Sequence, residues 1–124
     1  MLSINYKDPR PIYEQVRDAL RQLILSGAIA PGEELPSVRE LAASLAINPN
    51  TIQRSYRELE KLGLVNTVAG KGAFAATDGT AALRWREELM ATLSSTLREL
   101  KLLGVSESEL QSMVLAVFRK EDET

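Results

Sequence analysis

The sequence predicts a mainly α-helical protein with a small β-wing, in which a winged helix-turn-helix precedes a two-helix segment. Three observations support this fold class. Apolar residues recur at helical spacing in five segments of the chain. Helix-start and helix-stop residues separate the second and third of these segments by a turn of about three residues. Two strand-like runs joined by a glycine-containing turn follow directly after the third helix.

The first helix is expected to begin at Pro11 and to end at Gly27. Proline suits the first helical position, because the amide hydrogen that it lacks would have no partner there. Glycine suits the left-handed conformation that often follows the last turn. One apolar stripe lies between them, formed by Ile12, Val16, Leu20, Leu23 and Ile24.

The second and third helices each have their own start signal. Ser37 and Glu40 match a capping box, so the second helix is expected from Val38 to Ala46. Asn48 can cap the third helix with Pro49 in its first turn, and that helix is expected to run to about Leu62. The residues expected to face the core are Val38, Leu41, Ala42 and Leu45 in the second helix, and Ile52, Tyr56 and Leu59 in the third.

The predicted wing is a hairpin of two short strands. The runs 64–68 and 73–76 have strand-like composition, and Ala69-Gly70-Lys71-Gly72 supplies turn residues between them. A short joint at 78–80 follows, so the winged domain is expected to occupy residues 1–77 and a helical segment residues 78–124.

Two helices are expected in the helical segment. The first runs from about Ala81 to Leu103, and the second begins after a capping box at Ser106 and Glu109. Two packed helices would leave part of their apolar surface in water, and a large exposed apolar patch is unusual on a monomer. We therefore expect a homodimer, although packing of both helices on the winged domain is an alternative. The expected dimerisation residues are Leu89, Leu93, Leu97, Leu100 and Leu103, and Leu110, Met113, Val114, Val117 and Phe118.

Composition excludes several classes of protein. The 124 residues include no Cys and no His, so an ordinary zinc site and a Ser-His or Cys-His nucleophile pair cannot be built. No cofactor or metal is expected, and a carboxylate-only enzyme is a distant alternative. No apolar run approaches the roughly 20 residues that span a bilayer, and the first residues do not resemble a signal peptide. We expect a cytoplasmic protein without a membrane partner.

Charge is distributed unevenly along the chain. The net charge of −2 argues against nucleic acid when it is taken globally. Residues 1–77, however, hold nine Lys/Arg and eight Asp/Glu, which gives +1, whereas residues 78–124 hold six and nine, which gives −3. The sign changes where the sequence pattern changes, so the winged part is the one suited to a polyanion.

Four motifs in this order resemble the GntR family of bacterial regulators. They are PIYEQ at 11–15, LPSVRELA at 35–42, NPNT at 48–51 and GKG at 70–72 with Phe74. The short helical part that follows resembles the YtrA-like subfamily. The resemblance implies a winged helix-turn-helix, a dimer on a partly palindromic operator, usually repression, and no catalysis.

The start of the third helix carries the expected base-reading residues. A recognition helix presents its N-terminal residues to base edges in the major groove. Asn50 and Gln53 can pair with adenine, and Arg54 with guanine. Thr51 either contacts a phosphate or supports the turn. Asn48 and Pro49 belong to the same surface, although Asn48 is better explained as a cap than as a base contact.

The second helix and the wing supply the other expected DNA contacts. Arg39 matches a DNA-contacting arginine of the family, with an exposed helix-surface pair as the alternative. Ser37 can cap its helix and also contact a phosphate. Gly70 and Gly72 permit close approach to a DNA backbone, and Lys71 adds a charge. The family often has threonine after the second glycine, whereas this chain has Ala73 and so lacks that hydroxyl.

Two functional questions stay open at the level of sequence. A winged helix can also serve as a protein-interaction module, although such a face should be more apolar than the polar, basic start of the third helix. A small-molecule effector has no support in the sequence. The two C-terminal helices leave little room for a ligand pocket of about 300 Å³ within one chain, and a pocket between subunits remains an alternative.

Overall fold

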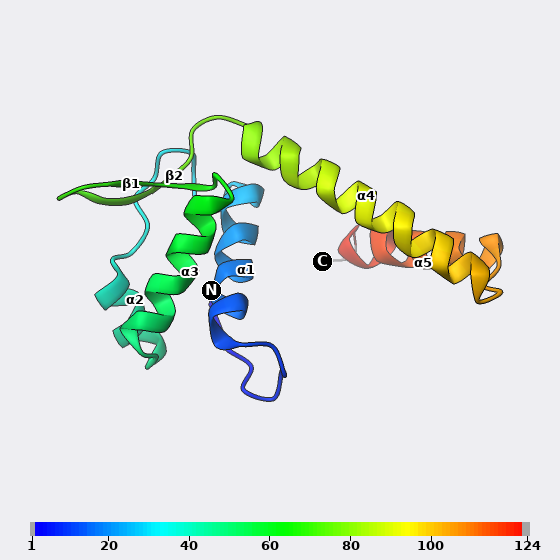
Figure 1. The fold of residues 1–124 in the computed structure, drawn as a ribbon, viewed down its shortest axis with the longest axis horizontal. Coiled ribbons are helices and arrows are strands. Elements are labelled where there is room, and N and C mark those ends of the chain that lie inside the picture. The colour runs from blue at the N-terminus through cyan, green and yellow to red at the C-terminus, as the bar shows by residue number, and fades with distance from the viewer. Residues whose placement is uncertain (1, 123–124) are drawn as a thin grey trace. The chain divides into compact units, whose positions relative to one another are not determined.

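The computed structural model describes residues 2–122, and these contain five helices and one two-stranded antiparallel sheet (Figure 1). The predicted fold class is confirmed. The chain divides into two compact units, and the division lies between Arg84 and Trp85. The elements are α1 (Ile12–Ser26), α2 (Val38–Leu45), α3 (Pro49–Lys61), β1 (Val65–Val68), β2 (Gly72–Ala75), α4 (Thr80–Leu102) and α5 (Glu107–Asp122).

In the N-terminal unit, α1, α2, α3 and the hairpin share one hydrophobic core. The apolar stripes expected from the sequence meet there, because each amphipathic helix must cover its stripe against another element. α1 and α3 lie side by side (Figure 1). The largest fully buried apolar side chains are Leu20, Ile52, Leu59, Val16 and Val65.

Caps define the helix-turn-helix as the sequence predicts. The Ser37 hydroxyl accepts a hydrogen bond from the Glu40 amide at 3.1 Å, and Asn48 Oδ1 accepts one from the Asn50 amide at 2.8 Å. Among the described residues, the Glu40 side chain forms no return bond to Ser37, so the capping box is half formed. The turn between the helices places Ala46 in the left-handed region at φ 55°.

The strands of the wing pair in antiparallel register, with Val65 opposite Ala75 and Val68 opposite Gly72. The segment before α2 adds to the outer edge of β2, because the Leu35 amide donates to the Ala73 carbonyl at 2.8 Å. An isolated bridge between Glu34 and Phe74 continues this pairing. The wing is thereby attached to the chain that leads into α2.

Several boundaries differ from the expectation by a residue or two. Pro11 caps α1 from outside, in an extended conformation, so the helix begins at Ile12. Gly72 is the first residue of β2, since it pairs with Val68, and the turn is therefore shorter than predicted. Leu103 lies in the turn after α4. Local propensity places elements well, but it does not settle their terminal residues.

The N-terminal unit extends beyond the expected domain boundary at residue 77. Ala81, in the first turn of α4, is buried with the core of the winged unit. The Arg84 side chain donates to the Leu62 carbonyl at the end of α3, at 2.9 Å. The start of α4 is thus part of this unit.

The C-terminal unit is a pair of helices from α4 and α5. The Val105 amide donates to the Leu100 carbonyl at 3.0 Å in the turn, and the Ser106 hydroxyl caps α5 by accepting from the Glu109 amide at 3.1 Å. From Trp85 to Lys120 no side chain is buried. None of the helices within residues 2–122 is both long enough and apolar enough to cross a bilayer.

Candidate nucleic-acid interface

Helix α3 divides its side chains between the core and a polar surface. Ile52, Tyr56 and Leu59 are buried as predicted, and Ser55 is buried with them. The other side of the first two turns is exposed and polar, and it carries Asn50, Gln53, Arg54 and Arg57. This distribution follows from the helical period, which brings every third or fourth residue back to the same face.

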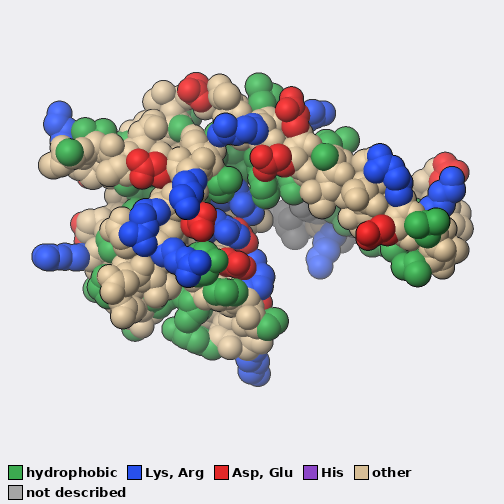
Figure 2. Space-filling view, in the orientation of Figure 1, with side chains coloured by type: hydrophobic (Ala, Val, Ile, Leu, Met, Phe, Trp, Pro, Cys, Tyr) green, Lys and Arg blue, Asp and Glu red, His purple; other side chains and the backbone are tan. Residues whose placement is uncertain are grey.

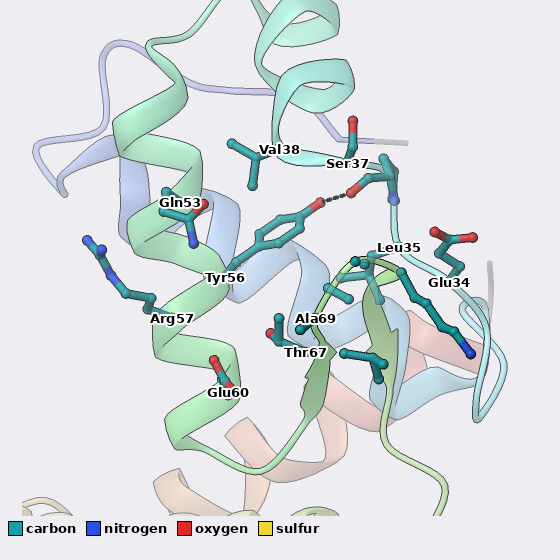
Figure 3. A pocket seen from close by; sticks show the side chains of 16 residues that line it. Glu34, Leu35, Ser37, Val38, Gln53, Tyr56, Arg57, Glu60, Thr67 and Ala69 are labelled. Atoms are coloured by element: carbon teal, nitrogen blue, oxygen red, sulfur yellow. Dashed lines mark hydrogen bonds between the residues drawn. The ribbon is translucent and has the colours of Figure 1, made fainter.

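A groove of about 410 Å³ lies between α3, the start of α2 and the wing (Figure 3). It brings together residues that are far apart in the sequence. Of the predicted DNA-binding residues, it is lined by Ser37, Gln53, Gly70, Lys71 and Gly72. The groove is also lined by Glu34, Glu60 and Thr67, which the sequence did not assign to this surface. Arg57 lines it as well, and the sequence left its role open between a solvent-facing and a phosphate-facing charge.

Tyr56 forms the floor of the groove and holds its walls together. The ring lies between Val38 and Leu35 in Figure 3, and its hydroxyl donates to the Pro36 carbonyl at 2.6 Å. Burial, with a smaller contribution from the negative charge of Glu40, raises the pKa of Tyr56 to about 12. The phenol keeps its proton to higher pH than an exposed tyrosine, and its hydrogen bond fixes the segment that carries Ser37.

The wing needs its glycines for steric reasons. Gly70 has φ +75° and Gly72 has φ +123°, in the region that side chains disfavour. A Cβ on Gly72 would also lie 2.9 Å from Glu34 Oε1. The Lys71 amide donates to the Val68 carbonyl at 3.0 Å, which closes the turn and leaves the Lys71 side chain exposed.

The remaining predicted residues lie outside the groove. Arg39 is exposed on the first turn of α2, and Asn50 is exposed on the first turn of α3. Asn48 acts as the cap of α3, and Pro49 takes the first helical position, as expected. Thr51 is half-buried in the first turn of α3, and its backbone carbonyl accepts a bond from the Ser55 hydroxyl at 3.2 Å.

Arg54 has a partner that the sequence did not reveal. Its guanidinium carbon lies 3.7 Å from the centroid of the Tyr13 ring, on α1. By helical period, Arg54 lies on the flank of α3 that faces α1, whereas Gln53 and Arg57 line the groove on the wing side. The polar surface of α3 is thus bordered by the wing on one flank and by α1 on the other.

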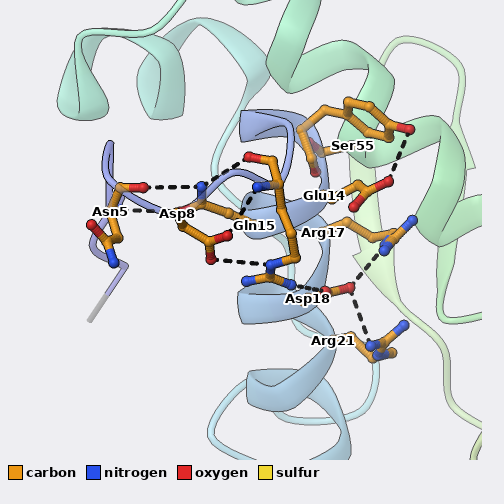
Figure 4. Close-up of polar contacts among 10 residues, drawn as sticks. Asn5, Asp8, Glu14, Gln15, Arg17, Asp18, Arg21 and Ser55 are labelled. Carbon is orange, nitrogen blue, oxygen red and sulfur yellow. Dashed lines mark hydrogen bonds and ion pairs between the residues drawn. The ribbon is translucent and has the colours of Figure 1, made fainter.

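The basic side chains fall into two electrostatic classes. Asp18 on α1 accepts from Arg10 at 2.7 Å, Arg17 at 2.9 Å and Arg21 at 3.1 Å, so one carboxylate serves three cations (Figure 4). Several other cations form no ion pair with any side chain in residues 2–120. Those on α2, α3 and the wing are Arg39, Arg54, Arg57, Lys61 and Lys71, and all but Lys61 lie near the predicted DNA contacts.

Figure 2 shows Lys and Arg side chains over α3 and at the end of the wing, with acidic side chains between them. Glu34 and Glu60 are the acidic residues of the groove itself. Unpaired cations beside hydrogen-bonding amides suit an anionic polymer whose bases are also read. Among the described residues, no acidic cluster could hold a metal ion.

Residues 12–75 match the model of the GntR family, described as bacterial regulatory proteins of the gntR family. The match covers α1, α2, α3 and the wing, which together build the groove. The chain belongs to the GntR family. This is a family of regulatory proteins and not of enzymes, in agreement with the expectation from the sequence.

Relatives of this GntR chain extend the comparison. It is 43% identical over 74 residues to the HTH-type transcriptional repressor YtrA of Bacillus subtilis, a match over 60% of this chain and 57% of that protein. This agrees with the predicted resemblance to the YtrA-like subfamily. A GntR-family regulator from Listeria monocytogenes is 33% identical, with a TM-score of 0.74 over 88% of this chain and 96% of that one.

A second similar structure was solved with DNA. It is the AraR DNA-binding domain in complex with an operator, 28% identical, with a TM-score of 0.53 over 60% of this chain and 90% of that domain. The 60% of this chain that is covered is close to the fraction of the chain that forms the winged unit, residues 1–84.

Proposed function

We propose that this protein is a sequence-specific, DNA-binding transcription repressor. The proposal rests mainly on one observation: the arginines near α1 form ion pairs, whereas the cations near the predicted DNA contacts do not. Arg10, Arg17 and Arg21, at and before α1, are paired with Asp8 and Asp18, whereas Arg39, Arg54, Arg57 and Lys71 have no acidic partner among residues 2–120. Unpaired cations on α2, α3 and the wing favour binding of a polyanion, because each can replace a counterion released from a phosphate.

The arrangement of α3 supports reading of the major groove. Asn50 and Gln53 lie on the exposed N-terminal half of the helix, where amide side chains can pair bidentately with adenine. Arg39, Ser37 and Lys71 lie around them on other elements and are suited to phosphates. Base contacts would then specify the sequence, and the surrounding contacts would position the protein.

We further propose that the C-terminal helices form a homodimer. In the single chain Leu93 is 50% exposed, Phe118 is 67% exposed, and the other expected dimerisation residues are exposed or half-buried. A cleft of about 550 Å³ between α4 and α5 is lined by Leu97, Leu110 and Val114. Since three stripe residues line it, we assign this cleft to a second subunit and not to an effector.

A two-fold dimer would suit a palindromic operator. Its two recognition helices would be separated by about 34 Å, one turn of DNA, or by a multiple of that distance. The similarity to a repressor supports repression in preference to activation. A regulator of this kind acts where the bacterial chromosome lies, which is the cytoplasm.

The test is a binding selection with fragments of the host genome, followed by affinity measurement on the selected site. We expect one or a few sites with two-fold symmetry. Arg39→Ala should weaken binding about five- to tenfold and lower the salt slope by about one, because one phosphate contact is lost. Arg98→Ala, an exposed arginine of the C-terminal unit, is the matched control and should change neither value.

Two outcomes would contradict the proposal. If no fragment binds more tightly than bulk DNA, the protein is not a sequence-specific regulator, and a protein-interaction module becomes the better description. If selected sites bind but Arg39→Ala and Arg98→Ala behave alike, the surface assigned to DNA is wrong.

A further inference from the structure

We propose that Tyr13 is a positioning residue for DNA recognition: its ring holds the Arg54 guanidinium so that the free edge of that group addresses acceptor atoms of the operator. The inference rests on the proposed function and adds to it a contribution from α1, outside the helix-turn-helix and the wing. According to this inference, the Arg54 side chain has one preferred orientation in the free protein.

The contact itself is close and specific. The Arg54 guanidinium carbon lies 3.7 Å from the centroid of the Tyr13 ring, well within the range over which the electron-rich face of a ring attracts a cation. Among residues 2–122, Arg54 forms no ion pair and donates no hydrogen bond to a protein acceptor. One face of the guanidinium is occupied, and its N–H groups remain available.

The platform beneath Arg54 is fixed. The hydroxyl of Ser55, which is fully buried, donates to the backbone carbonyl of Tyr13 at 2.8 Å. This bond joins the start of α1 to the residue that follows Arg54 in α3. The Tyr13 hydroxyl also approaches Glu14 Oε1 at 3.4 Å (Figure 4). The backbone of Tyr13 is therefore anchored to α3 before any ligand arrives.

A restrained arginine has a physical advantage in recognition. An exposed arginine samples many rotamers, and binding must restrict them at a cost in entropy. Stacking on Tyr13 removes part of that cost in the free protein. The planar fork of N–H donors matches two acceptors at the spacing found on the guanine edge or on a phosphate. Both sources lie on DNA, and the experiment below separates them.

The test is a double-mutant cycle on operator affinity with Tyr13→Leu and Arg54→Gln. Tyr13→Leu should weaken binding about three- to fivefold in the wild-type background, and it should have no further effect once Arg54→Gln is present. Tyr13→Phe keeps the ring and should bind within twofold of wild type. Because Ser55 bonds to the backbone of Tyr13, none of these substitutions removes that anchor.

Matched controls separate positioning from folding. Tyr6→Leu changes an exposed tyrosine, 69% accessible, that forms no ring contact within residues 2–122, and it should leave affinity unchanged. The Tyr13→Leu protein should melt close to the wild-type temperature by circular dichroism. If Tyr13→Leu unfolds the protein, Tyr13→Met supplies the cycle with Arg54→Gln, because methionine removes the ring and adapts to irregular apolar space.

The source of the acceptor follows from Arg54→Gln. Loss of preference at one base pair of each half-site indicates guanine, and a salt slope lower by about one indicates a phosphate. The proposal is overturned if the two substitutions act additively, if Tyr13→Phe is as weak as Tyr13→Leu, or if Arg54→Gln changes neither quantity. In each of these cases wild-type protein still selects an operator, so the proposed function would stand. Absence of any selected operator would instead refute the function itself.

Discussion

The two units of this chain use the same apolar residue in opposite ways. Leu20 and Leu59 of the winged unit are 1% and 0% exposed, whereas Leu93 and Leu103 of the C-terminal unit are 50% and 79% exposed. Three helices and a hairpin enclose a common core, but two helices share only one seam. The comparison shows that an apolar stripe is buried only when enough other helices or strands pack against it. The first unit supplies them internally, and for the second we propose that another chain supplies them.

The units also differ in charge. The winged unit contains Arg39, Arg54, Arg57 and Lys71, which form no ion pair with any described side chain, while residues 78–124 carry a net charge of −3. A polyanion is therefore attracted to one part of the molecule and repelled by the other. The proposed division into DNA binding and assembly agrees with this separation.

The strongest test of the comparison is Leu93→Asp, which should convert a dimer into monomers. A buried, unpaired carboxylate costs several kcal/mol, so affinity for a full operator should fall by more than about a hundredfold. Sedimentation and operator binding measure both effects. Ser94→Asp introduces the same charge at the next residue, which lies off the stripe, and should preserve the dimer. A wild-type chain that is monomeric at micromolar concentration would contradict the assignment.

Leu59→Ala should show that the winged unit has a self-sufficient core. Removing this fully buried side chain leaves a cavity, and we expect a loss of about 3 kcal/mol in the free energy of unfolding, measured with urea. Leu102→Ala truncates a side chain that is 88% exposed and should change stability by less than about 0.5 kcal/mol. If both substitutions lowered the free energy of unfolding equally, the winged unit would not differ from the C-terminal unit in having its own core.

High pH should destabilise only the winged unit through tyrosine, because all three tyrosines lie there. The raised pKa of Tyr56, about 12 against an ordinary value near 10, means that the folded state retains a proton that the unfolded state loses. This stability is complete below pH 10 and is lost as the pH rises through 12, with a magnitude of up to about 2 kcal/mol.

Tyr56→Phe should remove this pH dependence, while losing about 1 kcal/mol at neutral pH with the bond to Pro36. The measurement is unfolding by urea at pH 8 and pH 11. Tyr6→Phe is the control, because that side chain is exposed and should leave the pH profile unchanged. An identical profile for wild type and Tyr56→Phe would exclude the titration of Tyr56 as its cause.

The smallest expected effect concerns the turn of the helix-turn-helix. Ala46 has φ 55°, a conformation that glycine adopts without steric strain. Ala46→Gly should therefore raise the stability of the winged unit by about 0.5 kcal/mol. Ala43→Gly, at an exposed position within α2, should lower it by about the same amount, because glycine disfavours a helix interior. Changes of the same sign would show that the turn is not strained.

The element order, the caps and most of the core could be predicted from the sequence. Ser37 and Asn48 act within three residues along the chain, and the stripes of α1 and α3 depend only on helical period. The exposed face of α3 follows from the same period. Such features are local, so the order of residues determines them before any long-range contact forms.

The site needed contacts between distant residues. Tyr56 was expected in the core, but its bond to Pro36 depends on how α3 packs against the segment before α2. Arg57 could be placed in the groove only once the wing lay beside α3. The pairing of three arginines with Asp18 likewise combines α1 with the loop before it, and no single motif predicts it.

The sequence by itself thus determined which segments form helices, which form the wing, and which face of α3 is polar. Only the tertiary structure decided which cations are free, because pairing depends on distances across the fold. It also decided that Arg54 lies on Tyr13, two residues that are far apart in the chain and adjacent in space. The physical reason is range: helical hydrogen bonds and caps join residues three or four positions apart, whereas charge pairing and ring contacts act wherever packing brings side chains together.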